Sequence, residues 1–275
     1  MHAARRMAVT LICATFVTAA AGIASANERL MTYTYEPETM PQGSTEFEQW
    51  VTLRAGRSEE VGEDRFNKWE FQEEFEYGVT DNYTAALYLN ASSTNFEDPD
   101  TGDDTSEFEF DGVSLENRYM VWNPADHAVG LTLYLEPRYS GEEAELEEKI
   151  IIGQRAGDWK WALNLIHATE WADHLYEMEG EVDITAGLVR EFNPHWAAGL
   201  EFRNHNAFPE YQEWEHTVFS LGPVVSYRQE RWWATLTVLP QIFGRDLHND
   251  SDGHRHLVLD GHERINARLL IGIDF

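Results

Sequence analysis

The final segment of the chain, residues 264–275, alternates between apolar and polar positions. From Ile265 onward every second residue is apolar, and the segment ends on the aromatic Phe275. The positions between them are mostly polar or small. A period of two places apolar side chains on one face of a strand and polar side chains on the other. We therefore predict a strand here with one apolar and one polar face.

The same alternation runs through most of the chain upstream of this segment. In residues 45–55, Phe47, Val51 and Leu53 share one face, and charged side chains occupy the other. At Gly112 the alternation shifts by one residue, which indicates a β-bulge. Turn signals such as Gly157-Asp158 separate the segments. The pattern predicts about twelve strands of the length that crosses a membrane at a tilt.

Connection lengths and aromatic residues follow the strands in a regular way. Short turns are expected at residues 80–82, 123–126, 157–158, 193–194 and 230–231, and longer polar loops alternate with them. Aromatic residues gather near the strand ends, at the level of the turns and at the level of the loops. Two aromatic belts around an aliphatic band are typical of membrane barrels. Aromatic residues of a soluble sheet core would have no reason to collect there.

An alternating last strand that ends on an aromatic residue resembles the closing strand of Gram-negative outer-membrane β-barrel proteins. The resemblance in pattern extends over the whole mature chain. Within this class, the chain resembles an uncharacterised family. The resemblance implies an all-β fold, a transmembrane antiparallel up-and-down barrel of about twelve strands. It implies that Phe275 belongs to a membrane-insertion signal read by the barrel-assembly machinery. Periplasmic chaperones, outer-membrane lipid and lipopolysaccharide are the other partners that it implies.

The first residues have the features of a signal peptide. Arg5 and Arg6 precede an apolar stretch, and Ala24-Ser25-Ala26 is a small-residue cleavage pattern. We expect residues 1–26 to be removed on export to the bacterial outer membrane. Residues 27–42 then form a lead-in on the periplasmic side, and residues 43–275 form the barrel. The single cysteine, Cys13, lies in the signal peptide, so the mature chain has no thiol chemistry.

Charge and hydrophobicity narrow the class of protein. The formal net charge of -29 excludes nucleic acid as a partner. After residue 27 no run of about eighteen apolar residues could form a membrane-spanning helix. A hydrophobic content of 43% suits a barrel, because only alternate strand residues meet lipid.

The alternation directs many charged side chains to the inner face of the predicted barrel. An acid-rich lumen attracts cations and polar solutes, which favours a narrow passive channel, porin-like, for small polar or cationic solutes. Alternatively, the acids and bases pair across the lumen and close it. The candidate lumen residues are Glu46, Glu48, Arg54, Glu70, Glu74, Glu76, Glu116, Arg118, Glu136, Arg138, Glu145, Glu147, Lys149, Glu179, Glu181, Asp183, Glu201, Arg203 and Arg268.

Two other functions remain as alternatives: a surface hydrolase, and a structural or adhesive barrel. Asp98-Pro99-Asp100 and Asp246-Leu247-His248 loosely resemble the acid pair and the Asp/His pair of omptin proteases. A carboxylate that orients a histidine can activate water, but such short patterns are common in solvated loops. The His-x-Ser pair of outer-membrane phospholipases is absent from the sequence. We therefore predict no catalytic residue.

Histidines and aspartates crowd the loop of residues 248–256. Its Asp-x-Asp-Gly run resembles a calcium-binding loop, but the twelfth position is Leu259 where such a loop needs a bidentate glutamate. Adventitious binding of divalent ions is the expectation for this loop. The sequence predicts neither a dedicated metal site nor a cofactor.

Overall fold

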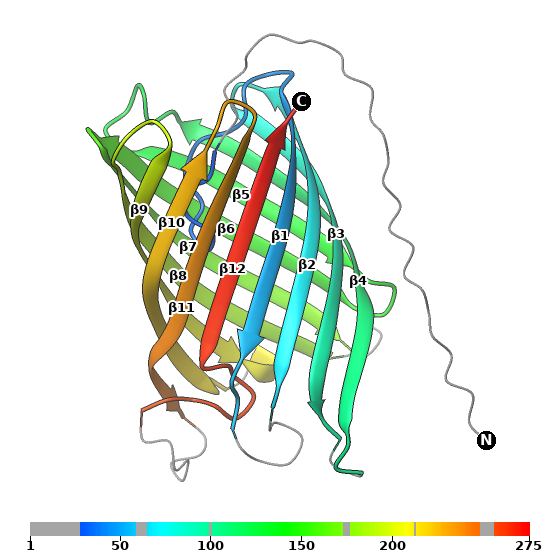
Figure 1. Cartoon of the computed structure of the whole chain (residues 1–275). Coiled ribbons are helices and arrows are strands. Elements are labelled where there is room, and N and C mark those ends of the chain that lie inside the picture. The colour runs from blue at the N-terminus through cyan, green and yellow to red at the C-terminus, as the bar shows by residue number, and fades with distance from the viewer. Residues whose placement is uncertain (1–27, 59–64, 99–100, 173–176, 212, 248–255) are drawn as a thin grey trace, which may run out of the picture.

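A computed structural model describes residues 28–58, 65–98, 101–172, 177–211, 213–247 and 256–275. These residues form a closed barrel of twelve strands, in which consecutive strands pair antiparallel and the last pairs with the first (Figure 1). The predicted fold class, an all-β up-and-down barrel, is confirmed. The strands are β1 (Thr45–Ala55), β2 (Asn67–Thr80), β3 (Tyr83–Glu97), β4 (Asp104–Trp122), β5 (Gly130–Tyr139), β6 (Ala144–Ala156), β7 (Trp159–Ala172), β8 (Glu177–Glu191), β9 (Trp196–Phe208), β10 (His216–Arg228), β11 (Trp232–Asp246) and β12 (Ile265–Asp274).

The final strand closes the barrel in a continuous register. Pairing between β1 and β12 runs from Glu46 opposite Asp274 to Ala55 opposite Ile265. The backbone N–H of Phe275 donates to the carbonyl of Thr45 over 3.2 Å. The side chain of Phe275 points outward and is 64% exposed. The start of β1 and the end of β12 therefore both lie at the end of the barrel that has the short turns (Figure 1).

The two faces of the strands differ as the alternation predicts. Along β1 the inward residues Glu46, Glu48, Trp50 and Thr52 are buried, and the residues between them are more exposed. The outer surface carries exposed aliphatic residues at mid-height and aromatic residues at both ends. Such a large apolar surface needs a nonaqueous environment. Among the residues that the structure describes, no helix has the length and apolarity to cross a membrane.

The bulge near Gly112 is present, and one expected regularity fails. The register between β3 and β4 shifts next to Asn90, opposite Gly112, whose φ of 97° is the left-handed conformation that glycine tolerates. The connection between β4 and β5 spans residues 123–129, which is longer than the connection at residues 140–143 on the other side. The alternation of short turns and long loops is therefore not strict.

The N-terminal segment, residues 28–42, lies inside the barrel up to Met40. This corrects the prediction that residues 27–42 form a lead-in on the periplasmic side. The segment enters at the short-turn end, descends into the lumen and returns to β1 (Figure 1). Met31, Thr32, Thr34 and Met40 are completely buried. The segment occupies the short-turn half of the lumen, where inward side chains of the strands supply hydrogen-bond partners for its backbone.

A positive charge on the outer face should destabilise the barrel, and the same charge on the inner face should not. Leu165 faces outward near the middle of β7, and its neighbour Ile166 faces the lumen. Leu165→Arg should lower the free energy of unfolding by about 2–4 kcal/mol, because an arginine there must enter lipid. Urea unfolding in lipid vesicles measures the change. Ile166→Arg is the matched control, and an equal loss in both variants would contradict the assigned faces.

Candidate functional site

The centre of the lumen is occupied by the backbone of residues 32–34, held by one carboxylate. Glu201, on the inner face of β9, is fully buried. It accepts hydrogen bonds from the backbone N–H groups of Thr32, Tyr33 and Thr34 over 3.0, 3.0 and 2.9 Å. The hydroxyl of Thr237 on β11 donates to the same carboxylate. A buried backbone outside a sheet needs such partners, so Glu201 fixes the depth of the segment.

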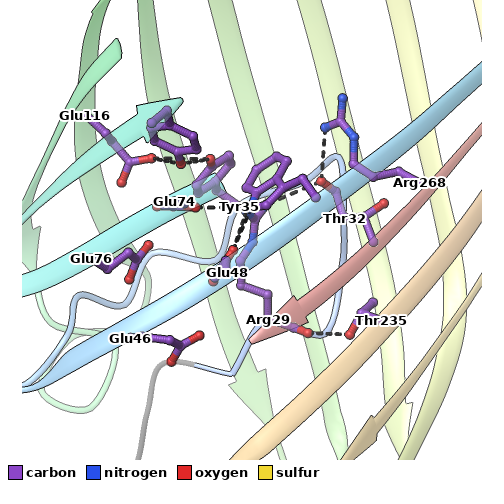
Figure 2. Close-up of polar contacts among 12 residues, drawn as sticks. Arg29, Thr32, Tyr35, Glu46, Glu48, Glu74, Glu76, Glu116, Thr235 and Arg268 are labelled. Atoms are coloured by element: carbon purple, nitrogen blue, oxygen red, sulfur yellow. Dashed lines mark hydrogen bonds and ion pairs between the residues drawn. The ribbon is translucent and has the colours of Figure 1, made fainter. Parts of the chain in front are cut away.

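Other inward polar residues hold the rest of the segment. Asn164 on β7 clamps Tyr35: its amide oxygen accepts the backbone N–H over 2.7 Å, and its amide nitrogen donates to the carbonyl over 2.9 Å. The hydroxyl of Thr84 on β3 accepts a hydrogen bond from the N–H of Met40. The hydroxyl of Thr235 on β11 donates to the carbonyl of Arg29, as Figure 2 shows. The candidate list omits these neutral residues, because threonine and asparagine are common on any wet strand face.

Five predicted lumen acids gather around Arg29 and Arg118 in the short-turn half of the barrel. The guanidinium of Arg29 lies 3.9 Å from Glu48 and packs over the rings of Tyr35 and Trp50 (Figure 2). The guanidinium of Arg118 pairs with two of the acids. Buried charges without a partner cost several kcal/mol. Arg29 of the segment supplies a positive charge next to these buried acids. The acids are Glu46, Glu48, Glu74, Glu76 and Glu116, all buried.

Two inward glycines make room for the segment. A Cβ atom on Gly187 would lie 2.0 Å from the sulfur of Met31. A Cβ atom on Gly78 would lie 2.0 Å from the carbonyl oxygen of Pro41. Any larger residue would overlap the N-terminal segment at these positions. The barrel wall is therefore shaped to fit the segment. An inward glycine within a strand is the sequence signal that could have indicated a close approach.

A cavity of about 540 Å³ occupies the loop-side half of the lumen. Tyr33 and Tyr35 of the N-terminal segment line it on the short-turn side. Glu143, an exposed residue of the loop at 140–143, also lines it, so the cavity extends to the loop end. Eleven of the predicted lumen residues line this cavity: Arg54, Glu70, Glu136, Arg138, Glu145, Glu147, Lys149, Glu181, Asp183, Arg203 and Arg268.

The remaining predicted lumen residues lie elsewhere. Glu46, Glu48, Glu74, Glu76, Glu116, Arg118 and Glu201 are buried against or near the N-terminal segment. Glu179 lies near the loop end of β8 and is exposed. The structure thus separates the candidate residues into a group that packs around the segment and a group that surrounds open space.

Acids outnumber bases around the cavity, although several of them are paired. Ten acidic and six basic side chains line it. Arg54 pairs with Glu70 over 3.1 Å, and Arg203 pairs with Asp183 over 2.6 Å. Lys149 lies 2.6 Å from Glu147. These ion pairs join residues of one strand or of neighbouring strands, and acids outnumber bases around the open space. The channel and the closed lumen both stay predictions.

The connection between β11 and β12 folds inward at the loop end. Val258 and Leu259 are buried, and Gln241 on β11 bonds to the N–H and the carbonyl of Val258 over 2.7 and 2.9 Å. Arg57 donates to Glu263 over 2.9 Å. Burial lowers the pKa of the His262 imidazole to about 3. This connection is therefore anchored to β11 and to the residues that follow β1.

The two loop patterns weighed as hydrolase sites fall partly outside the described residues. Asp98 and Asp246 are described, whereas Pro99, Asp100 and His248 are not. The acid pair and the Asp/His pair therefore stay sequence hypotheses.

Comparison with known proteins supports the fold. A family model described as "Family of unknown function (DUF6662)" matches residues 23–150 and 153–275. No curated protein matches the chain. The COG4313 outer membrane channel from Pseudomonas putida F1 is similar in structure, with a TM-score of 0.59 and 11% identity over 89% of this chain and 100% of that chain. The NanC porin has a TM-score of 0.52 and 9% identity over 82% of this chain and 98% of that chain.

These two neighbours are an outer-membrane channel and a porin. The predicted resemblance to outer-membrane β-barrel proteins is confirmed. At such low identity the likeness concerns the fold.

Loss of the Glu201 carboxylate should release the N-terminal segment. Thr34→Cys places a thiol where a buried hydroxyl has no hydrogen-bond partner among the described residues. The protein used for labelling begins after the predicted signal peptide, which contains the only natural cysteine, Cys13. A bulky maleimide should label it slowly. Adding Glu201→Ala removes bonds of about 1.5–3 kcal/mol each to a charged acceptor, so labelling should become at least tenfold faster.

The control for this labelling experiment is Glu179→Ala, which removes an inward acid remote from the segment. Heat-modifiable migration on a gel verifies that each barrel is folded. Equal labelling rates in all three proteins would show that Glu201 does not hold the segment.

Proposed function

The chain belongs to DUF6662, a family of unknown function, and we propose that it is an outer-membrane channel for small polar or cationic solutes, gated by its N-terminal segment. The observation that carries this proposal is the arrangement of the lumen. A charged cavity extends to the loop end, and a segment outside the sheet lies across the lumen next to it.

The way in which the segment is held suits a gate. It contributes no strand to the barrel, so its departure breaks no hydrogen bond between strands. Its backbone is bound by side chains of β3, β7, β9 and β11. Such contacts reorganise locally without unfolding the sheet. An opening of the lumen is therefore compatible with an intact barrel.

The cavity supports the solute class. Its volume of about 540 Å³ lies within the range of about 300–1,000 Å³ that is usual for small-molecule sites. The acidic excess lowers the energy of a cation in this confined space and raises that of an anion. The paired acids and bases also offer hydrogen-bond partners to a neutral polar solute.

The outer surface supports insertion in the bacterial outer membrane. Leu87, Leu133 and Leu165 expose aliphatic side chains at mid-height, and Trp159 and Trp196 lie near the short turns. Aromatic residues at this level match the membrane interface. Lipid and lipopolysaccharide are the partners proposed for this surface, and the assembly machinery is proposed for the strand that ends at Phe275.

Deletion of residues 28–42 should convert a mostly closed channel into an open one. In planar lipid bilayers the full mature chain should give rare and small currents, and the deletion variant should give frequent, larger ones. A potassium chloride gradient should show a preference for cations in the open variant. Equal currents in both proteins would overturn the gate, and a preference for anions would overturn the solute class.

The selectivity has a matched pair of control variants. Glu136→Gln removes a cavity acid, whereas Glu148→Gln removes an acid on the outer face of β6. In the deletion background the first should weaken the cation preference and the second should leave it unchanged.

A further inference from the structure

Three histidines from separate parts of the chain meet at the loop end of the barrel. His205 belongs to β9, His216 begins β10, and His262 lies in the connection between β11 and β12. Their ring centroids are 5.5 Å apart for His205 and His216, 5.4 Å for His205 and His262, and 5.7 Å for His216 and His262. One nitrogen of each ring lies within 4.8 Å of a nitrogen of both others.

Each ring is fixed through its Nδ1 atom. His205 Nδ1 lies 2.8 Å from a carboxylate oxygen of Asp183, and His216 Nδ1 lies 3.3 Å from a carboxylate oxygen of Glu215. His262 Nδ1 lies 3.3 Å from the carbonyl oxygen of Glu263. Histidines that bind metals use their second ring nitrogen in this way, donating to a carboxylate or a carbonyl. The outer contacts of the cluster thus have the form of a metal site.

One Nε2 atom of the cluster is left for another partner. The Nε2 of His216 is buried and has no hydrogen-bond partner within the described part of the chain. A buried polar atom without a partner costs about 1–3 kcal/mol. Packing alone therefore does not account for this arrangement, because a hydrocarbon ring would fill the same space without that cost.

The charges around the cluster favour a cation. Glu181 lies 3.9 Å from His205, in addition to the carboxylates of Asp183 and Glu215. Arg203 approaches His205 Nδ1 to 3.3 Å, but its charge is balanced by Asp183 at 2.6 Å. The neighbouring Glu263 is held by Arg57. The acids next to the rings outnumber the bases.

We infer that His205, His216 and His262 form a binding site for a divalent transition-metal ion, represented experimentally by Zn²⁺ or Co²⁺. Imidazole nitrogen suits zinc, copper and nickel, and three histidines with an open fourth position are a known zinc ligand set. With Zn–N bonds of about 2.0–2.1 Å, three rings on one tetrahedral ion have centroids about 5 Å apart. The observed centroid distances of 5.4–5.7 Å are slightly longer, so the rings must move closer together to bind one ion.

The location gives the ion a structural consequence that goes beyond the channel proposal. His262 lies on the connection between β11 and β12, and the other two rings belong to β9 and β10 of the barrel wall. A bound ion would link this connection to β9 and β10. The ion would lie beside Asp183, which also lines the cavity.

Cobalt spectroscopy on the untagged mature protein in detergent tests the site. After treatment with EDTA, titration with Co²⁺ should give one saturable equivalent with the intense visible bands of a tetrahedral complex, and Zn²⁺ should displace it. Because loss of an outer-shell partner alone costs about 10–100-fold in affinity, His216→Ala and His262→Ala should each weaken binding at least about 100-fold. His195→Ala, at the short-turn end, should bind like the unchanged protein.

Two further variants keep the test decisive. His216→Gln keeps a polar side chain in place, so folding is preserved, and it should also lose the tetrahedral bands. A protein in which His248, His254 and His256 are all replaced by alanine should retain them. The inference is overturned if no saturable equivalent binds, if the His216 and His262 variants bind normally, or if the triple loop variant alone loses binding. None of these readouts depends on channel activity.

Discussion

The lumen of this barrel depends on one carboxylate that accepts three consecutive backbone N–H groups. Glu201 is buried, and an ionised carboxylate without partners would be very costly there. Residues 32–34 have the complementary problem, because their backbone lies outside any sheet. The three N–H groups donate to the carboxylate, so both the carboxylate and the backbone have hydrogen-bond partners. This contact sets the depth of residues 32–34, and the cavity lies beside them.

Charge couples the segment to the rest of the wall. The strands direct more acids than bases into the lumen, and the segment carries Arg29 to the place where those acids are deepest. Closer to the loops the acids line the open cavity. The same alternation therefore produces a tightly packed half that holds the segment and a half that contains the cavity. The proposed gate and the proposed selectivity have one origin.

The sequence predicted the barrel well, because a period of two is a local property. The limits of β1, Thr45–Ala55, match the first alternating segment, and the bulge at Gly112 follows from a one-residue slip. The N-terminal segment has no such period. Its partners Asn164 and Glu201 are more than a hundred residues away in the chain, so nothing in the sequence brings them together. The three histidines escaped prediction for the same reason, since they come from separate elements and form no spaced motif.

The most direct test of the account is the current through single molecules of the Glu201→Ala variant, recorded in the same bilayer conditions as the unchanged protein. Without the carboxylate, the backbone of residues 32–34 loses its acceptor, and the segment should leave the lumen far more often. The fraction of time that the variant spends open should rise greatly, with the barrel still folded. An open fraction equal to that of the unchanged protein would show that Glu201 does not keep the lumen closed.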